Sequence, residues 1–146
     1  VEALNIDLLA HPQGGETGYF ARLQVNSGTK GQITTTGTNC TFSDVSDYRL
    51  KEDWQPLEGS IDRLKELNPV NFTWKLNGAR AEGFLAHEVS DIVPGAVTGE
   101  KDAVDENEDE IHQMIDQSKL VPLLVAAVQE LSEKVESLEA QVSGSS

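Results

Sequence analysis

A heptad repeat near the C-terminus constrains this 146-residue chain more than any other feature. Seven apolar residues recur there at spacings that alternate between three and four: Val121, Leu124, Val128, Leu131, Val135, Leu138 and Val142. The spacing predicts a long helix over residues 118–142 whose narrow apolar stripe, here called the seam, packs in a coiled coil. Ser118 is its expected N-cap, and Pro122 falls in the first turn, where a missing N–H costs little. Residues 143–146 are expected to form a tail.

The first turns of this helix carry a wider apolar face, because Leu120, Leu123 and Ala127 flank the seam. We therefore expect this end to pack on the chain's own domain, and the remaining seam to be buried by self-association. The alternative is a seam that is buried wholly within one chain. Valine at one seam position with leucine at the other nominally favours two strands.

The composition also favours burial between copies. Only 38% of the residues are hydrophobic and 5% aromatic, which is thin for a self-sufficient globule. The net charge of −14 repels phosphate backbones and anionic lipid, so neither nucleic acid nor a membrane is expected as a partner. No apolar run approaches the ~20 residues that a membrane span needs.

Residues 1–45 are rich in threonine, glycine and asparagine and carry strand patterns over residues 4–8, 21–26, 32–36 and 39–42. Loops are expected over residues 12–18, around Gly28 and Gly31, and at residues 37–38. One chain has too few large side chains to cover such a sheet on both faces, whereas several wrapped chains could. Residues 1–45 are thus predicted to be the end of a fibrous β stem, or alternatively a small β extension of the next domain.

Residues 46–117 predict a small α+β unit. A short helix over residues 60–67 is expected to be capped by Ser60 and stopped by Asn68 and Pro69. A strand over residues 70–76, a turn at Asn77-Gly78 and a returning strand over residues 82–86 predict a hairpin. A second short helix over residues 87–93 should end before a proline. The overall fold class is therefore α+β, with a β-rich stem and a long C-terminal helix.

Two polar clusters suggest metal sites but fit them poorly. Residues 105–109 imitate the start of a calcium loop, yet Glu110 stands where that loop needs glycine, so a solvated acidic loop is expected. His87-Glu88 lacks a second histidine four residues after the first, because Asp91 is there. We expect His87 to pack or to donate hydrogen bonds, and we expect no metal and no cofactor.

Residues 46–51 mark the change from the threonine-rich part to the charged, helical part. Ser46 stands five residues before Lys51, which allows two interpretations. One is an N-cap serine and a surface lysine. The other is a Ser-Lys dyad, in which the hydroxyl is the nucleophile and a deprotonated amine is the base.

Three motifs occur in order and favour the dyad. Residues 46–51 read SDYRLK, residues 83–89 read GFLAHEV before Pro94, and residues 120–131 read LVPLLVAAVQEL. Together they resemble the C-terminal intramolecular chaperone domain of phage tailspikes, tail fibres and endosialidases, a self-cleaving Ser-Lys peptidase family. The module is also similar to one in myelin regulatory factor. The resemblance covers residues 46–142, about two thirds of the chain.

The resemblance implies that residues 46–142 trimerise, help the preceding β fibre of the same chain to fold, and then cut themselves off. It implies a homotrimer despite the seam's nominal preference for two strands. Ser46 matches the family nucleophile and Lys51 its base, which makes Val45–Ser46 the scissile bond. The protein would be a virion tail precursor in the host cytoplasm during assembly, and the chaperone part would be released after cleavage.

The implied chemistry is consistent with the residues. An exposed lysine is protonated near neutral pH, whereas burial in an assembled domain would favour the neutral amine. Ser46 would then attack the carbonyl carbon of Val45 and form an ester that water hydrolyses. Asp47, Arg49, His87, Glu88 or backbone N–H groups are candidates for oxyanion or supporting roles, and the sequence does not choose among them. Alternative functions are a structural trimer cap that never cuts and a calcium-regulated binding module built on the acidic loop.

Overall fold

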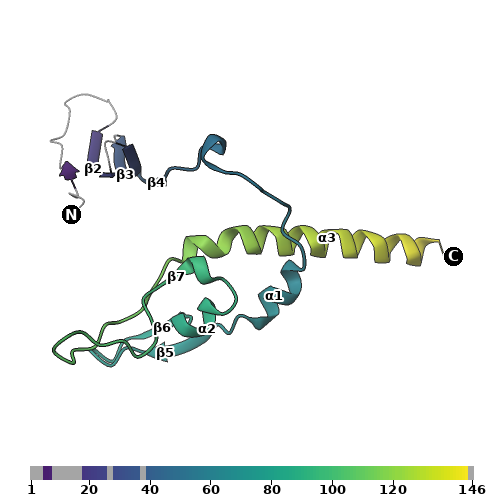
Figure 1. Cartoon of the computed structure of the whole chain (residues 1–146). Helices are drawn as coiled ribbons and strands as arrows, with labels where there is room; N and C mark the ends of the chain where they lie inside the picture. Colours follow the sequence, from purple (N-terminus) through teal and green to yellow (C-terminus); the bar gives the residue numbers. More distant parts are fainter. Residues whose placement is uncertain (1–4, 8–17, 26–27, 37–38, 145–146) are drawn as a thin grey trace. The chain divides into compact units, whose positions relative to one another are not determined.

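The computed structural model describes residues 5–7, 18–25, 28–36 and 39–144. The chain divides into two compact units, Val1–Trp54 and Gln55–Ser146 (Figure 1). Small antiparallel sheets and a long C-terminal helix confirm the predicted α+β class. The fibrous stem, the trimeric coiled coil and a functional division at residue 46 remain predictions.

The first unit contains an antiparallel sheet whose four strands lie in chain order. They are β1 (Asn5–Asp7), β2 (Gly18–Val25), β3 (Gly28–Thr36) and β4 (Asn39–Asp44), near the four expected segments. The expected loop over residues 12–18 lies outside the described residues except for Gly18, which begins β2. Phe42 on β4 is 77% exposed, so one chain leaves a large apolar side chain of this sheet in water.

The loop expected around Gly28 and Gly31 is wrong, because both glycines lie within β3. Gly31 pairs with Asp44 on one side and with Leu23 on the other. A Cβ atom at Gly31 would stand 3.3 Å from the backbone oxygen of Ser43. Glycine therefore marks a close approach of two strands here, and the turn-like composition misled the prediction.

The second unit begins with the expected helix, hairpin and helix. α1 (Ser60–Glu66) ends just before Asn68 and Pro69, as predicted. β5 (Val70–Thr73) and β6 (Arg80–Gly83) pair as an antiparallel hairpin, which is followed by α2 (Ala86–Ser90). The returning strand starts two residues earlier than predicted, because Gly78 at φ 71° lets the chain turn back after Trp74.

The segment after α2 contains elements that the sequence patterns did not reveal. A 3-10 turn, η2 (Pro94–Ala96), leads into β7 (Val97–Thr98), which pairs with β8 (Met114–Ile115). The acidic stretch is therefore the end of a long hairpin, in which Val104 bridges to Glu110. A second 3-10 turn, η3 (Gln117–Leu120), precedes α3 (Val121–Ser143).

Two helix caps differ from the sequence prediction. Ser60 is not the N-cap of α1. Gly59 holds that position with φ 63°, and the Glu130 carboxylate of α3 accepts hydrogen bonds from the Ser60 and Ile61 backbone N–H groups, at 2.6 and 3.3 Å. Ser118 is not an N-cap either, because Asp116 accepts a hydrogen bond from the Ser118 N–H at 3.0 Å and caps η3. Pro122 lies in the first turn of α3, as predicted.

The core of the second unit lies where α1 and α2 meet η3 and the start of α3 (Figure 1). Its buried apolar residues are Leu67, Val89, Ala96, Leu120 and Leu123. Leu120, Leu123 and Ala127 are at most 4% exposed, which confirms that this end of the helix packs on its own domain. Among the described residues, no helix combines the length and apolar character needed to cross a membrane.

Candidate functional site

The segment around residues 46–51 forms a single tight turn. A 3-10 helix, η1 (Tyr48–Leu50), is closed by the Leu50 N–H to the Asp47 carbonyl at 3.1 Å and by the Lys51 N–H to the Tyr48 carbonyl at 3.0 Å. The sequence patterns did not indicate this turn. An aspartate followed by a short run without glycine or proline is an N-cap signal that was available.

The turn brings the two residues of the predicted dyad into contact. The Nζ atom of Lys51 donates a hydrogen bond to Oγ of Ser46 at 2.6 Å. A neutral amine at the same place would accept the hydroxyl proton, which is the contact that a Ser-Lys base requires. Both residues are exposed in the single chain.

The predicted scissile residue lies at the end of a strand ladder. The Val45 N–H donates to the Lys30 carbonyl at 3.1 Å, which extends the β3–β4 pairing by one residue. A hollow of about 140 Å³ lies beside it, and its lining comprises Thr29, Gly31, Gln32, Ser43, Asp44 and Val45. The carbonyl that Ser46 would attack therefore belongs to a residue that the sheet holds.

Asp47 and Arg49 form an ion pair across the turn. Oδ1 of Asp47 accepts from the Arg49 backbone N–H and from its Nε, each at 2.9 Å, and Oδ2 accepts from Nη2 at 2.6 Å. The Arg49 side chain, with help from its backbone N–H, lowers the pKa of the Asp47 carboxyl below its ordinary value. The same hydrogen bonds raise the pKa of the Arg49 guanidinium. These contacts hold Asp47 and Arg49 together within the turn, and an oxyanion or supporting role for either residue remains a prediction.

His87 and Glu88 lie in α2 of the second unit and not in this turn. Glu88 Oε2 accepts a hydrogen bond from the Asn68 side chain at 3.2 Å, and the His87 carbonyl accepts one from the Ser90 hydroxyl at 2.7 Å. Both contacts stabilise the α2 region. An oxyanion or supporting role for either residue remains a prediction.

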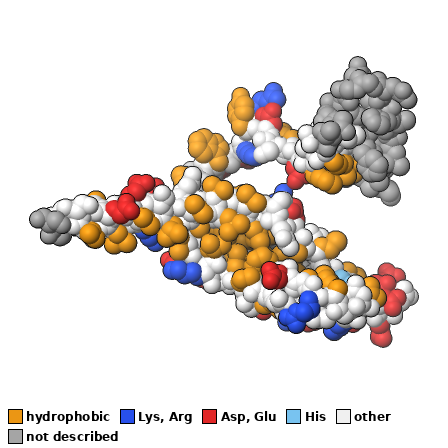
Figure 2. Space-filling model, turned by 180° about the vertical axis from the view of Figure 1, so that it is seen from behind, with side chains coloured by type: hydrophobic (Ala, Val, Ile, Leu, Met, Phe, Trp, Pro, Cys, Tyr) orange, Lys and Arg blue, Asp and Glu red, His pale blue; other side chains and the backbone are white. Residues whose placement is uncertain are grey.

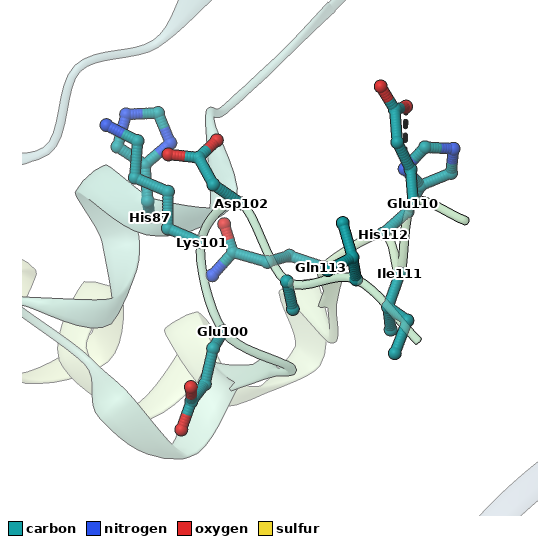
Figure 3. A pocket seen from close by; sticks show the side chains of 10 residues that line it. His87, Glu100, Lys101, Asp102, Glu110, Ile111, His112 and Gln113 are labelled. Atoms are coloured by element: carbon teal, nitrogen blue, oxygen red, sulfur yellow. Dashed lines mark ion pairs between the residues drawn. The ribbon is translucent and has the colours of Figure 1, made fainter. Parts of the chain in front are cut away.

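His87 also lines a hollow of about 400 Å³ beside the acidic hairpin (Figure 3). The opposite side holds Glu110 and His112, whose Oε2 and Nδ1 atoms are 3.9 Å apart and would form an ion pair when the histidine is protonated. Within the described residues, no group of three or more His, Cys, Asp or Glu side chains is arranged to hold a metal ion. Asp105 accepts the N–H groups of Asn107 and Asp109 at 2.8 and 3.0 Å, which lowers its pKa and closes the loop end.

The seam is a second candidate surface. All seven seam residues on α3 are between 45% and 72% exposed. Apolar side chains continue from α3 onto the adjoining surface (Figure 2), where a groove of about 400 Å³ is lined mainly by leucine, proline and phenylalanine. Leu124 belongs to both the seam and this groove. A contiguous apolar surface of this kind is typical of a protein interface.

Comparison with known proteins finds relatives of the segment that begins at Ser46. Residues 46–98 match the family described as chaperone of endosialidase. The match begins at Ser46 and confirms the family that the motifs indicated. The chain is also similar to the long tail fiber protein Gp37 of Enterobacteria phages K3 and T2, with 31% identity to each over 102 residues. That alignment covers 66% of this chain but only 8% and 7% of the two relatives, so the chain spans less than a tenth of their length.

Proposed function

We propose that residues 46–142 are the intramolecular chaperone of a phage tail fibre, and that they trimerise and then cut themselves off at Val45–Ser46. The observation that carries the proposal is the 2.6 Å contact between Lys51 Nζ and Ser46 Oγ, at the residue where the family match begins. The similarity to two long tail fibre proteins supports the fibre as the client and a virion tail precursor as the context.

The cleavage proceeds in two steps, formation of an ester and its hydrolysis. The neutral Lys51 amine takes the hydroxyl proton of Ser46, and Oγ attacks the carbonyl carbon of Val45. The C–N bond breaks, the lysine returns the proton to the departing nitrogen, and Val45 becomes an ester of Ser46. Water then hydrolyses the ester, which leaves a carboxyl group on Val45 and a free amine and hydroxyl on Ser46.

Assembly acts as the gate for this reaction. In a single chain the two residues are in contact, but both are exposed to water. Burial of the turn among three chains disfavours the charged amine and so creates the base. The exposed seam of α3 is the surface that brings the copies together, and cutting follows folding for this reason. Cleavage releases the chaperone part from the fibre.

Intact-mass measurement on fresh protein, repeated over time, tests the proposal. The parent chain should yield fragments 1–45 and 46–146, whereas Ser46→Ala should stay whole while keeping its oligomeric state. Ser43→Ala, which removes another hydroxyl three residues upstream, is the matched control and should cut like the parent. Cleavage of Ser46→Ala at the parental rate would exclude Ser46 as the nucleophile.

A structural trimer cap that never cuts is the second candidate. The exposure of Ser46 and Lys51 in the single chain is the observation that favours it. A parent protein that forms a trimer by light scattering but keeps its full mass at every pH would establish the cap.

A further inference from the structure

The turn that carries the dyad lacks the packing that normally holds a turn in place. No residue of η1 is buried, and Tyr48 and Leu50 are 80% and 73% exposed. Five residue steps of extended chain would separate Ser46 from Lys51 by about 17 Å. A local device must therefore keep the turn closed and the two side chains in contact.

We propose that Asp47 and Arg49 form a clasp that positions Lys51 against Ser46 for cleavage. The inference rests on the proposed self-cleavage and assigns a task to two residues that the reaction itself does not consume. Both act through the turn and not on the reacting atoms, so they are positioning residues.

The clasp holds the turn through both the backbone and the side chain of Arg49. Through Oδ1, Asp47 accepts a hydrogen bond from the Arg49 backbone N–H of η1, and through both oxygens it holds the edge of the Arg49 guanidinium. A fork-shaped cation on a carboxylate is a strong, directional contact. Arg49 is the middle residue of η1, and its side chain folds back onto Asp47 in this turn. The Lys51 backbone, which follows directly, is thereby fixed where Nζ reaches Ser46 Oγ.

The same geometry argues against Arg49 as an oxyanion donor. Nε and Nη2 face the Asp47 carboxylate, which compensates the guanidinium charge. An oxyanion donor works by directing uncompensated positive charge or a free N–H at the developing negative oxygen. Asp47 itself, as an anion, has no proton to donate.

A double-mutant cycle on the full chain separates these two roles. The first-order cleavage rates of Asp47→Ala, Arg49→Ala and the double variant are measured by mass or gel across a range of pH. Each single change should lower the plateau rate on the order of tenfold, since misplacement of a reacting group is costly. The double variant should be no slower than the slower single variant, because one contact is lost only once. Two losses that multiply would overturn the clasp in favour of independent roles.

The pH profile and a conservative variant provide further readouts. Loss of positioning should lower the plateau without moving the pH midpoint, which belongs to the base. Asp47→Asn keeps the shape and a capping oxygen but loses the charge, so it should cut at a rate between those of the parent and Asp47→Ala. Glu52→Gln removes a carboxylate next to Lys51 and should leave the rate within twofold of the parent. If Glu52→Gln lost as much cleavage rate as the Asp47 variants, the loss would be due to the removal of any nearby negative charge, and the clasp would be wrong.

The outcomes for the two proposals are distinguishable. If Ser46→Ala is inert while Asp47→Ala and Arg49→Ala cut at the parental rate, the self-cleavage stands and the clasp is wrong. If the parent chain does not cut, or if Ser46→Ala cuts, both proposals fall. Light scattering on each variant checks that its oligomeric state matches that of the parent, so that a slower rate reports lost positioning and not lost assembly.

Discussion

Residues 46–51 and the helix α3 differ in how much of their working geometry one chain supplies. The dyad contact and the Asp47–Arg49 pair form among six consecutive residues, without a partner. The seam residues lie on a fully formed helix at the heptad spacing, yet each of the seven stays at least 45% exposed. The Ser46–Lys51 contact is thus formed locally, whereas a single chain leaves the seam exposed to water.

Two adjacent leucines on α3 show the same contrast at the scale of one residue. Leu123 is 3% exposed and belongs to the core of the second unit, whereas Leu124 is 46% exposed and belongs to the seam. The first side chain stabilises the fold of one chain, whereas the second is proposed to contact another copy. Substitutions in the core and in the seam should therefore have separable effects on the stability of one unit and on association.

The largest effect is expected at the dyad itself. Lys51→Arg keeps a cation that can donate to Ser46, but guanidinium does not release its proton in this range. Cleavage should fall on the order of a thousandfold or more, as it does when a catalytic base is removed. With Lys51 intact the rate should rise with pH and level off once the amine is neutral, as measured by time-resolved mass analysis. Lys30→Arg is the matched control, and a pH-independent parental rate would exclude Lys51 as the base.

The next effect concerns the seam. Leu138→Asp places a charge at a position that is 60% exposed in one chain, so the fold of each unit should be unaffected. In an assembled seam the same charge would be buried unpaired, and light scattering should show monomers in place of trimers. The monomer should also cut far more slowly, because Lys51 is not buried.

Ser137→Asp is the control for this experiment, because it puts the same charge on the neighbouring position, outside the seam. It should keep the trimer and the parental cleavage rate. A Leu138→Asp protein that remains trimeric would mean that the copies meet at another surface. One that is monomeric yet cuts normally would separate assembly from catalysis.

The sequence predicted elements that have a repeating pattern or a local turn signal. It missed hydrogen bonds to residues that are distant in the chain. The heptad spacing predicted α3, and the Asn77-Gly78 pair predicted the β5–β6 hairpin. The two caps were wrong for a common reason: serine is a good cap by composition, but acidic side chains satisfy the N–H groups instead. Glu130 comes from 70 residues away, and no local pattern indicates such a partner.

Within the candidate site, the motif singled out Ser46 and Lys51, which the structure brings into contact, but it did not indicate the turn that joins them. Their roles as nucleophile and base remain predictions. Local propensity gives little signal for a three-residue 3-10 turn without buried residues. The pairing of Asp47 with Arg49 follows from their side-chain lengths and charges once the turn exists. The β7–β8 pair was missed because two strands of two residues are too short to show alternation.

A moderate effect is expected in the core of the second unit. Leu123→Ala removes a buried side chain beside Leu67 and Val89, which should destabilise this unit by about 2–5 kcal/mol. Thermal unfolding should show the loss even where the seam is disrupted. Leu124→Ala is the matched comparison, since it should weaken association and leave the stability of a monomeric unit nearly unchanged. If monomeric Leu123→Ala and Leu124→Ala lost the same unfolding free energy, the distinction between core and seam would be wrong.

The smallest effect is expected at the cap that Glu130 provides for α1. The Ser60 and Ile61 N–H groups stabilise the ionised carboxylate, the first more strongly, and so lower the pKa of Glu130 from its ordinary value of 4.5. A carboxyl group whose pKa is lowered on folding stabilises the folded state above its unfolded pKa, and this contribution is lost as the pH falls through the folded value. Glu130→Gln should therefore melt below the parent at neutral pH.

The difference between parent and Glu130→Gln should persist down to about pH 4.5 and shrink below it, as the parental carboxylate takes up a proton. Glu133→Gln removes a carboxylate one turn further along α3 and should follow the parent at every pH. The cap lies within one chain, so the difference should survive in the monomeric Leu138→Asp background. A difference that appears only in the trimer would show that Glu130 stabilises the contact between copies and not the packing of α1 on α3.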